Sequence, residues 1–270
     1  MKVCIVIGSR ADEGLLEWPS KVLSEDPFFS VNRLSLKGCR FDDAFLWTKS
    51  QIAEGRPDVV LMLGDRYEIL AAATACHLAR VPIAHIAGGD VTEGSYDDAM
   101  RDCISRMASL HFVTSTSAMA RLTHMGMKNV HLVGNPGVDY IRHGPWRKMT
   151  PCIQKPYVLV AYYPETIDDT VDLKAVEEAI AGRSAIWIKP NPDRGSERIP
   201  GTLEFSHAQF LSVMANCEEF IGNSSAMLYE APELGIKTRM IGKRQKGRTI
   251  PWGDGNASQR IATILKYTNV

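Results

Sequence analysis

The stretch PDVVLMLGD, residues 57–65, contains an unbroken apolar run, VVLML (59–63), that is followed by a glycine and an aspartate. A continuous apolar run that stops at a turn residue is typical of a strand buried on both faces of a parallel sheet. The same form recurs in KVCIVIGS (2–9) and in IAHIAGGD (83–90). An apolar, alanine-rich segment with helical character, YEILAAATACHLARV (67–81), separates two of these runs. The stretch therefore predicts a doubly wound α/β domain.

The alternation of strands and helices continues along the chain and breaks once. The proline-rich and basic stretch 142–156 has no clear period, and we interpret it as a linker between domains. Before the linker, further strands are predicted at 110–115 and 129–135, and helices at 97–108 and 117–126. After it, strands are predicted at 157–164, 184–193, 218–225 and 236–248 (the last with a basic loop), and helices at 172–180, 208–217, 225–235 and 257–268. We expect two Rossmann-like domains, 1–145 and 146–270, whose loops face a central cleft.

Composition excludes several classes of protein. The chain has 31 acidic and 31 basic residues, so no bulk basicity indicates nucleic acid. No run of 18 apolar residues predicts a membrane span, and the N-terminus reads as a first strand instead of a signal peptide. The six cysteines are isolated, which favours reduced thiols in a cytoplasmic protein.

The segment EEFIGNSSAMLYEA (218–231) has the residues that a phosphate site needs. Gly222 permits close approach of a ligand, and Ser224 and Ser225 are hydroxyl donors at the expected start of a helix. Glu230 is acceptor-only when ionised, and it suits the two hydroxyl groups of a ribose. A basic loop follows in GKRQKGR (242–248). Together these residues predict a nucleoside diphosphate site.

Several segments, taken in order, resemble the hydrolysing UDP-N-acetylglucosamine 2-epimerase family. That family has the two-domain GT-B fold. The segments that carry the resemblance are GSRADEGLL (8–16), LGDRYEILAAA (63–73), VPIAHIAGGD (81–90) with the following 91–115, VGNPGVDYI (133–141), IGNSSAMLYEAPELGI (221–236) and IGKRQKGR (241–248).

The resemblance implies a UDP-sugar as ligand, and it implies a homodimer. Asp65 and Asp97 would lie at the sugar end of the cleft, and Asp90 and Asp98 are further candidates for catalysis. The residues predicted to bind UDP are Arg10, Asn223, Ser224, Ser225, Glu230, Arg244, Gln245 and Arg248.

Two positions depart from the family pattern, and the chain is shorter than typical members. Ala87 stands where a glutamate usually precedes Gly-Gly, and Tyr163, in AYYPET (161–166), stands where a histidine precedes proline. Alanine transfers no proton, and tyrosine is a poor base at neutral pH because its ordinary pKa is near ~10. The nucleotide-binding half is thus kept, whereas the proton-transfer half is altered.

Three functions follow from this contrast. The first is a UDP-sugar-dependent glycosyltransferase, in which an aspartate orients an acceptor hydroxyl that the sequence does not identify. The acceptor is a small molecule or a polymer, and modified DNA is only weakly supported. The second is the hydrolysing epimerase itself, with Asp90, Glu93, Asp97 and Glu165 as available carboxylates and Tyr163 as an acid. The third is a UDP-sugar-binding protein without catalysis.

No metal or dinucleotide cofactor is expected. GSRADEG (8–14) lacks the second and third glycines of the dinucleotide fingerprint, so NAD is not predicted. His85 and His111 lie in apolar strands without ligands at metal-binding spacing, and we interpret them as core residues.

Overall fold

The computed structural model describes residues 1–93, 95–149, 153–165, 168, 170–190 and 194–268. The chain forms two compact units. Unit 1 consists of Met1–Val91, Asp97–Arg142 and Pro251–Val270, and unit 2 of Thr92–Tyr96 and His143–Ile250. Residues 150–152 of the predicted linker, 166–167 of the AYYPET neighbourhood and 191–193 of the predicted strand at 184–193 lie outside the described residues.

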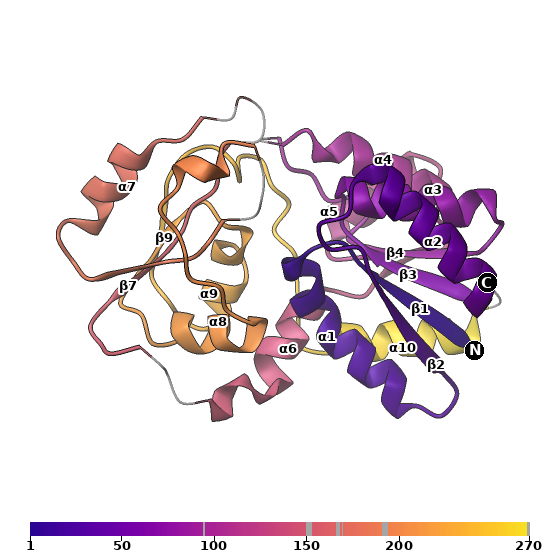
Figure 1. Ribbon diagram of the computed structural model, residues 1–270. Coiled ribbons are helices and arrows are strands. Elements are labelled where there is room, and N and C mark those ends of the chain that lie inside the picture. Colours follow the sequence, from indigo (N-terminus) through magenta and orange to yellow (C-terminus); the bar gives the residue numbers. More distant parts are fainter. Residues whose placement is uncertain (94, 150–152, 166–167, 169, 191–193, 269–270) are drawn as a thin grey trace. The chain divides into compact units, whose positions relative to one another are not determined.

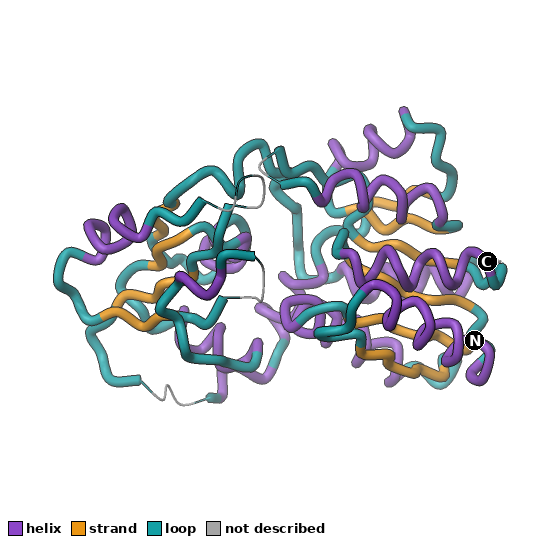
Figure 2. Tube along the Cα trace, turned by 45° about the horizontal axis from the view of Figure 1, so that its top comes forward, coloured by secondary structure: helices purple, strands orange, loops and turns teal. Residues whose placement is uncertain are grey.

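Unit 1 contains a parallel sheet of six strands in the order β2-β1-β3-β4-β5-β6 (Figures 1 and 2). Their bounds are β1 Lys2–Ile7, β2 Ser30–Ser35, β3 Val59–Leu63, β4 Ile83–Ile86, β5 Leu110–Val113 and β6 Val130–Leu132. All five residues of β3 and all four of β4 are buried, as their continuous apolar sequences predict.

Helices cover both faces of this sheet. Alternate β1 residues point to opposite faces, so Val3, Ile5 and Ile7 join one core while Cys4 and Val6 join the other. The first core is closed by α1 and α10, and the second by α2, α3 and α4. The helices of unit 1 are α1 Arg10–Glu25, α2 Phe41–Gly55, α3 Tyr67–Leu78, α4 Asp97–Met107, α5 Thr116–His124, α6 Pro136–His143 and α10 Ala257–Tyr267.

Unit 2 has its own parallel sheet of four strands, in the order β10-β9-β7-β8. The strands are β7 Val158–Ala161, β8 Ala185–Trp187, β9 Phe220–Gly222 and β10 Thr238–Met240. The α-helices are α7 Leu173–Ile180, α8 His207–Met214 and α9 Glu230–Glu233, and the 3-10 helices are Pro145–Lys148, Ser196–Arg198 and Ser225–Met227. Two parallel α/β units confirm the predicted fold class.

The predicted helix 225–235 is wrong as a continuous element. It divides into the 3-10 helix Ser225–Met227 and the four-residue α9. Pro232 explains the division, because it has no N–H for the carbonyl of Leu228 and its ring crowds that carbonyl. Ser224 and Ser225 therefore do not stand at the N-terminus of a long helix.

The predicted domain limits also need correction at the C-terminus. The first boundary falls at Arg142, close to the expected residue 145, but residues 251–270 belong to unit 1 and not to the second domain. Ile261, Ala262 and Leu265 of α10 are buried in the first core of unit 1. The apolar face of the last helix thus returns the chain to the first sheet.

Candidate functional site

The carboxyl ends of β1, β3 and β4 carry the polar loops of unit 1. These strands are neighbours, so the loops that follow them lie along one edge of the sheet. Asp12, in the first turn of α1, accepts a hydrogen bond from the Gly8 N–H at 3.1 Å. Burial raises the pKa of Asp12, although its bonds to Ser9 and Gly8 and the charge of Arg66 act against that rise. Sequence reasoning missed Asp12, which is buried beside the predicted site.

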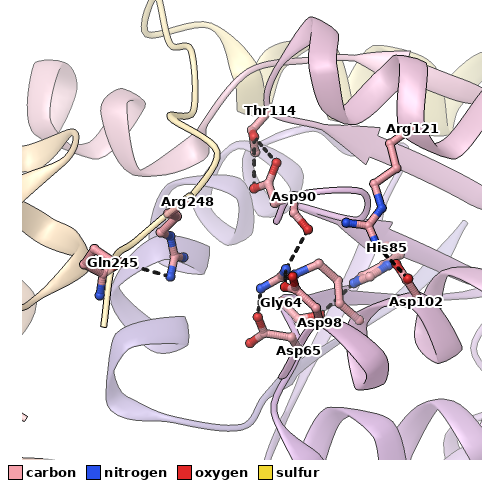
Figure 3. Close-up of polar contacts among 11 residues, drawn as sticks. Gly64, Asp65, His85, Asp90, Asp98, Asp102, Thr114, Arg121, Gln245 and Arg248 are labelled. Atoms are coloured by element: carbon pink, nitrogen blue, oxygen red, sulfur yellow. Dashed lines mark hydrogen bonds and ion pairs between the residues drawn. The ribbon is translucent and has the colours of Figure 1, made fainter. Parts of the chain in front are cut away.

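Arg101 of α4 gathers three of the four predicted catalytic aspartates. Its guanidinium pairs with the carboxylates of Asp65 and Asp98, and Nη1 donates to the backbone carbonyl of Asp90 at 2.6 Å (Figure 3). The Arg101 side chain is only 2% exposed. Because a buried guanidinium needs charged partners, Arg101 fixes both carboxylates at the end of β3 and the start of α4.

Asp90 contributes its backbone carbonyl to Arg101, and its carboxylate has a partner at the end of another strand. The carboxylate of Asp90 accepts from Thr114 Oγ1 at 2.9 and 3.1 Å, so its side chain points to the end of β5 (Figure 3). Asp97 is the first residue of α4. Asp65 and Asp98 are thus held by one cation, and Asp97 begins the helix that carries this cation.

His85 locks the backbone next to Asp65. Its Nε2 lies 2.8 Å from the Gly64 carbonyl, and its Nδ1 lies 3.0 Å from Ser105 Oγ. Because a carbonyl only accepts, Nε2 carries the proton and Nδ1 accepts from the serine. Burial lowers the pKa of His85 to about 4, so the ring is neutral at pH 7. Its interpretation as a core residue is confirmed by its complete burial.

Ala87 lies in the left-handed backbone region, with φ +63°. Its N–H donates to the Phe112 carbonyl at 2.9 Å, which anchors the turn to β5. The next residue, Gly88, is required by space, because a Cβ there would lie 2.7 Å from Ser105 Oγ. The turn that carries the altered family position is therefore tightly fixed, and its methyl group brings no proton-transfer chemistry.

In unit 2, Asn223 joins the loops after β7 and β9. Its amide group accepts from the Tyr163 N–H and donates to the Tyr163 carbonyl, each at 2.8 Å. Gln245 Nε2 donates to the Asn223 carbonyl at 2.8 Å, so the basic loop after β10 joins the same network. Since β10, β9 and β7 are adjacent, the three loops form one polar edge. Asn223, Gln245 and Tyr163 are thereby brought together.

Arg244 of the basic loop also contacts the loop that follows β7. Arg244 Nη1 donates to the Pro164 carbonyl at 2.5 Å, and its guanidinium lies 5.4 Å from the centre of the Tyr163 ring. Arg248 Nη1 donates to Gln245 Oε1 at 3.4 Å (Figure 3). Three of the predicted UDP ligands, Arg244, Gln245 and Arg248, are thus placed on one loop.

The carboxylates Glu93 and Glu165 also lie against this loop. Glu165 Oε1 accepts from the Lys243 N–H at 2.7 Å. Glu93 packs over Gly247, where a Cβ would lie 2.3 Å from its Cδ. Both belong to unit 2, whereas the aspartates held by Arg101 belong to unit 1.

Ser224 and Glu230 both form hydrogen bonds with other residues of the chain. Ser224 Oγ accepts from the Ala226 N–H at 3.3 Å and caps the 3-10 helix that begins at Ser225. Glu230 Oε1 lies 2.8 Å from His207 Nε2. Sequence reasoning missed His207, because nothing in the chain pattern links residues 207 and 230. Arg10, at the start of α1, belongs to unit 1, and the other predicted UDP ligands belong to unit 2.

Among the described residues, no group of three or more His, Cys, Asp or Glu side chains could hold a metal ion. None of the helices described is sufficiently long and apolar to cross a membrane.

Comparison with solved structures places the fold in the GT-B class. The UDP-GlcNAc 2-epimerase of Neisseria meningitidis bound to UDP-GlcNAc superposes with a TM-score of 0.80 at 16% identity, covering 99% of this chain and 100% of that one. The Methanocaldococcus jannaschii UDP-GlcNAc 2-epimerase in complex with UDP-GlcNAc and UDP gives 0.81 at 17% identity, with 99% and 100% covered.

Sequence comparison assigns the family. The profile of the UDP-N-acetylglucosamine 2-epimerase family matches residues 47–250, and the chain belongs to that family. A hydrolysing GDP/UDP-N,N'-diacetylbacillosamine 2-epimerase of Campylobacter jejuni is 28% identical over 85% of this chain and 66% of its own length. A UDP-N-acetylglucosamine 2-epimerase of N. meningitidis is 29% identical over 72% and 58%. The chain thus spans about three fifths of the curated relatives it matches.

Proposed function

We propose that this protein is a hydrolysing 2-epimerase that acts on a UDP-activated 2-acetamido sugar. The reaction removes the proton at C2 of the sugar, expels UDP, and adds water across the resulting glycal. The observation that carries the proposal is the pair of carboxylates, Asp65 and Asp98, that Arg101 fixes at the carboxyl edge of the first sheet. A protein that only binds a nucleotide has no need of carboxylates held in this way.

We assign proton removal to a residue of unit 1 and nucleotide binding to residues of unit 2. We assign removal of the C2 proton to Asp65. Its Oδ2 pairs with Arg101, and its second oxygen, Oδ1, would accept the proton as a general base. Departure of UDP leaves negative charge on the diphosphate, and we assign its stabilisation to Ser225, Arg244 and Arg248. Glu230 would accept the ribose hydroxyl groups. Short helical segments follow the serines, so hydroxyl and guanidinium groups, instead of a helix dipole, supply this stabilisation.

The glycosyltransferase remains a second candidate because of two specific residues. Ala87 and Tyr163 replace the family's acid and base, and neither side chain suits proton abstraction at neutral pH. The family assignment and a hydrolysing relative favour the epimerase, because the family profile matches residues 47–250 and the relative aligns with 85% of this chain.

One NMR experiment separates these functions. The protein is incubated with UDP-GlcNAc in heavy water, and a UDP-diacetamido sugar serves as a second donor. Free UDP together with a free 2-epimerised sugar that carries deuterium at C2 is the expected result. UDP release that depends on an added acceptor would instead identify a transferase, and binding without release would contradict catalysis.

Two variants test the assignment of Asp65. Asp65→Asn should lower turnover by at least about a hundredfold, in the range typical for loss of a general base, while UDP still binds. The matched control is Asp102→Asn. Asp102 lies on the same helix as Arg101 and pairs with Arg121 at 2.7 Å, so the change removes an ion pair without touching Asp65. Equal activity of the two variants would contradict the assignment.

Two further predictions from the sequence belong with this proposal. The homodimer implied by the resemblance is testable by light scattering of the purified protein. The cytoplasmic location is testable by fractionation of the cells that make it.

A further inference from the structure

Glu230 and His207 form a buried polar pair in unit 2. His207 is the first residue of α8, and Glu230 is the first residue of α9. His207 Nε2 lies 2.8 Å from Glu230 Oε1, and the two side chains are 12% and 6% exposed. A carboxylate has no proton to donate when it is ionised, so His207 is the donor in this bond.

The start of α8 is itself fixed, which holds His207 in place. Ser206 and Gln209 form a capping box, in which the Ser206 N–H donates to Gln209 Oε1 at 2.8 Å and the Gln209 N–H donates to Ser206 Oγ at 3.3 Å. The capping box satisfies the backbone N–H groups of the first turn. The side chain of His207 is therefore attached to a fixed part of the backbone.

A free glutamate side chain has several rotamers, and ordering it on ligand binding costs conformational entropy. The bond from His207 engages Oε1 and orients the plane of the carboxylate before a ligand arrives. Each carboxylate oxygen can accept two hydrogen bonds, so the bond to Oε1 leaves a second acceptor position on Oε1 and does not engage Oε2. A carboxylate whose plane is fixed in this way is suited to two neighbouring hydroxyl groups, such as the 2′ and 3′ hydroxyls of a ribose.

We propose that His207 is a positioning residue that sets the ribose selectivity of this site through Glu230. The inference rests on the proposed function, since it takes a uridine diphosphate as ligand. A purely structural pair between α8 and α9 makes a different prediction. Loss of a purely structural pair would weaken the binding of all nucleotides by the same factor. Loss of a positioning residue would weaken the binding only of ligands that have the hydroxyl groups.

Calorimetry with two ligands tests this difference. UDP and 2′,3′-dideoxy-UDP share the uracil and the diphosphate and differ only in the two hydroxyls. We expect the parent protein to bind UDP at least about tenfold more tightly, as hydrogen bonds to a charged group imply. In His207→Leu the ratio should fall to within about threefold. His207→Gln keeps a donor of similar reach and should restore most of the preference.

Matched variants complete the test. His124→Leu, an exposed histidine on α5, should leave the ratio unchanged. Glu230→Gln should lower the ratio as His207→Leu does, because both affect the same acceptor. If His207→Leu does not fold, His207→Asn is the replacement, since its shorter amide leaves Glu230 without this donor and should also lose the preference.

The outcomes separate this inference from the proposed function. If the parent protein and the folded His207 variant bind UDP with the same preference over the dideoxy ligand, the role of His207 is refuted and the UDP site stands. If the parent protein binds neither ligand, the proposed function fails, and the inference fails with it. If the parent protein binds both ligands equally, the ribose role of Glu230 and of His207 is refuted while UDP binding is kept.

Discussion

At the scale of single residues, Gly222 is the position where the polar edge of unit 2 tolerates least change. Its φ is +139°, and a Cβ there would lie 2.0 Å from the Ala161 carbonyl oxygen on the neighbouring strand. Backbone atoms cannot rotate away as a flexible side chain can. We expect Gly222→Ala to destabilise the protein by at least about 3 kcal/mol, which urea unfolding would measure.

Gly182 provides the matched control for Gly222. Its φ is +74°, but apart from its two chain neighbours, no atom of the described residues lies within 4 Å of a Cβ placed there. Gly182→Ala should therefore cost only the left-handed backbone strain, about 1 kcal/mol. Similar losses in the two variants would show that the close approach of β7 and β9 is not what requires Gly222.

Two buried histidines in adjacent strands make stability depend on pH. His85 and His111 are register partners in β4 and β5, and burial lowers the pKa of each from 6.5 to about 4. The unfolded chain binds protons at higher pH than the folded one. Stability is therefore complete above about pH 6.5 and falls as the pH decreases toward 4, by about 1.4 kcal/mol per pH unit for each histidine.

Replacing one histidine should remove its share of this dependence. His111 Nδ1 has no hydrogen-bond partner among the described residues, so His111→Leu removes a buried ionisable group without breaking a bond at that atom. Urea unfolding between pH 7 and 4.5 should show a slope that is smaller than that of the parent protein by about 1.4 kcal/mol per pH unit. The exposed His124→Leu should keep the full slope, and the comparison cancels the opposing effect of the raised pKa of Asp12. An unchanged slope in His111→Leu would rule out its titration as a cause.

Individual residues also show what sequence could and could not predict. Asp65, Asp98, Asn223 and Gln245 were identifiable because each lies in a motif next to a strand end. Arg101, which holds two of the aspartates, is a helix residue whose partner Asp65 lies 36 positions away in the chain. His207 lies 23 positions from Glu230. Partners at such separations are set by packing, and no local pattern encodes them.

At the scale of elements, apolar runs predicted the strands of both sheets except β2, which is one of three elements near the N-terminus that went unpredicted. Helices α1 and α2 and strand β2 occupy residues that sequence reasoning left unassigned. Strand β2 is at the sheet edge, and most of its residues are exposed, so it lacks a continuous apolar run. The division of the predicted helix 225–235 could have been predicted from Pro232, because a proline interrupts the hydrogen bonds of a helix interior locally.

The capping of α10 gives a prediction for a whole element. Asn256, the N-cap residue, makes no side-chain cap, and Asp139 of α6 substitutes for it. Its carboxylate accepts from the Ala257 N–H at 3.1 Å and the Ser258 N–H at 2.6 Å, and the residue is fully buried. Asp139→Ala should cost about 2 to 3 kcal/mol and increase hydrogen exchange in α10.

Asp172 is the matched control for this cap. It caps α7 locally, accepting from the Ala175 N–H at 3.0 Å, and its surroundings are more exposed. Asp172→Ala should cost only about 1 kcal/mol, the usual value for one exposed cap. Exchange in α10 that stays as slow in Asp139→Ala as in the parent protein would contradict the role of this bond.

At the scale of the whole molecule, the chain leaves unit 1 and comes back to it. The return segment is tied to the strand ends of the first sheet, since Trp252 N–H donates to the Thr114 carbonyl at 2.8 Å and its carbonyl accepts from the Asn135 N–H at 2.7 Å. Sequence pattern predicted the helix at 257–268 but assigned it to the nearer domain. A helix's own sequence shows that it has an apolar face, but not which sheet that face will cover.

This return predicts how the protein responds to loss of its last twenty residues. Removing 251–270 uncovers the first core where Ile261 and Leu265 pack with Leu16 and Leu23 of α1. Each large buried side chain lost from a core costs about 2 to 5 kcal/mol, so the sum approaches the whole stability of an ordinary domain. Hydrogen exchange resolved by segment should therefore show that β1, β3 and α1 lose protection, while β7 and β9 of unit 2 keep it. If protection were instead lost first in unit 2, α10 would belong to the second domain, as the sequence alone had suggested.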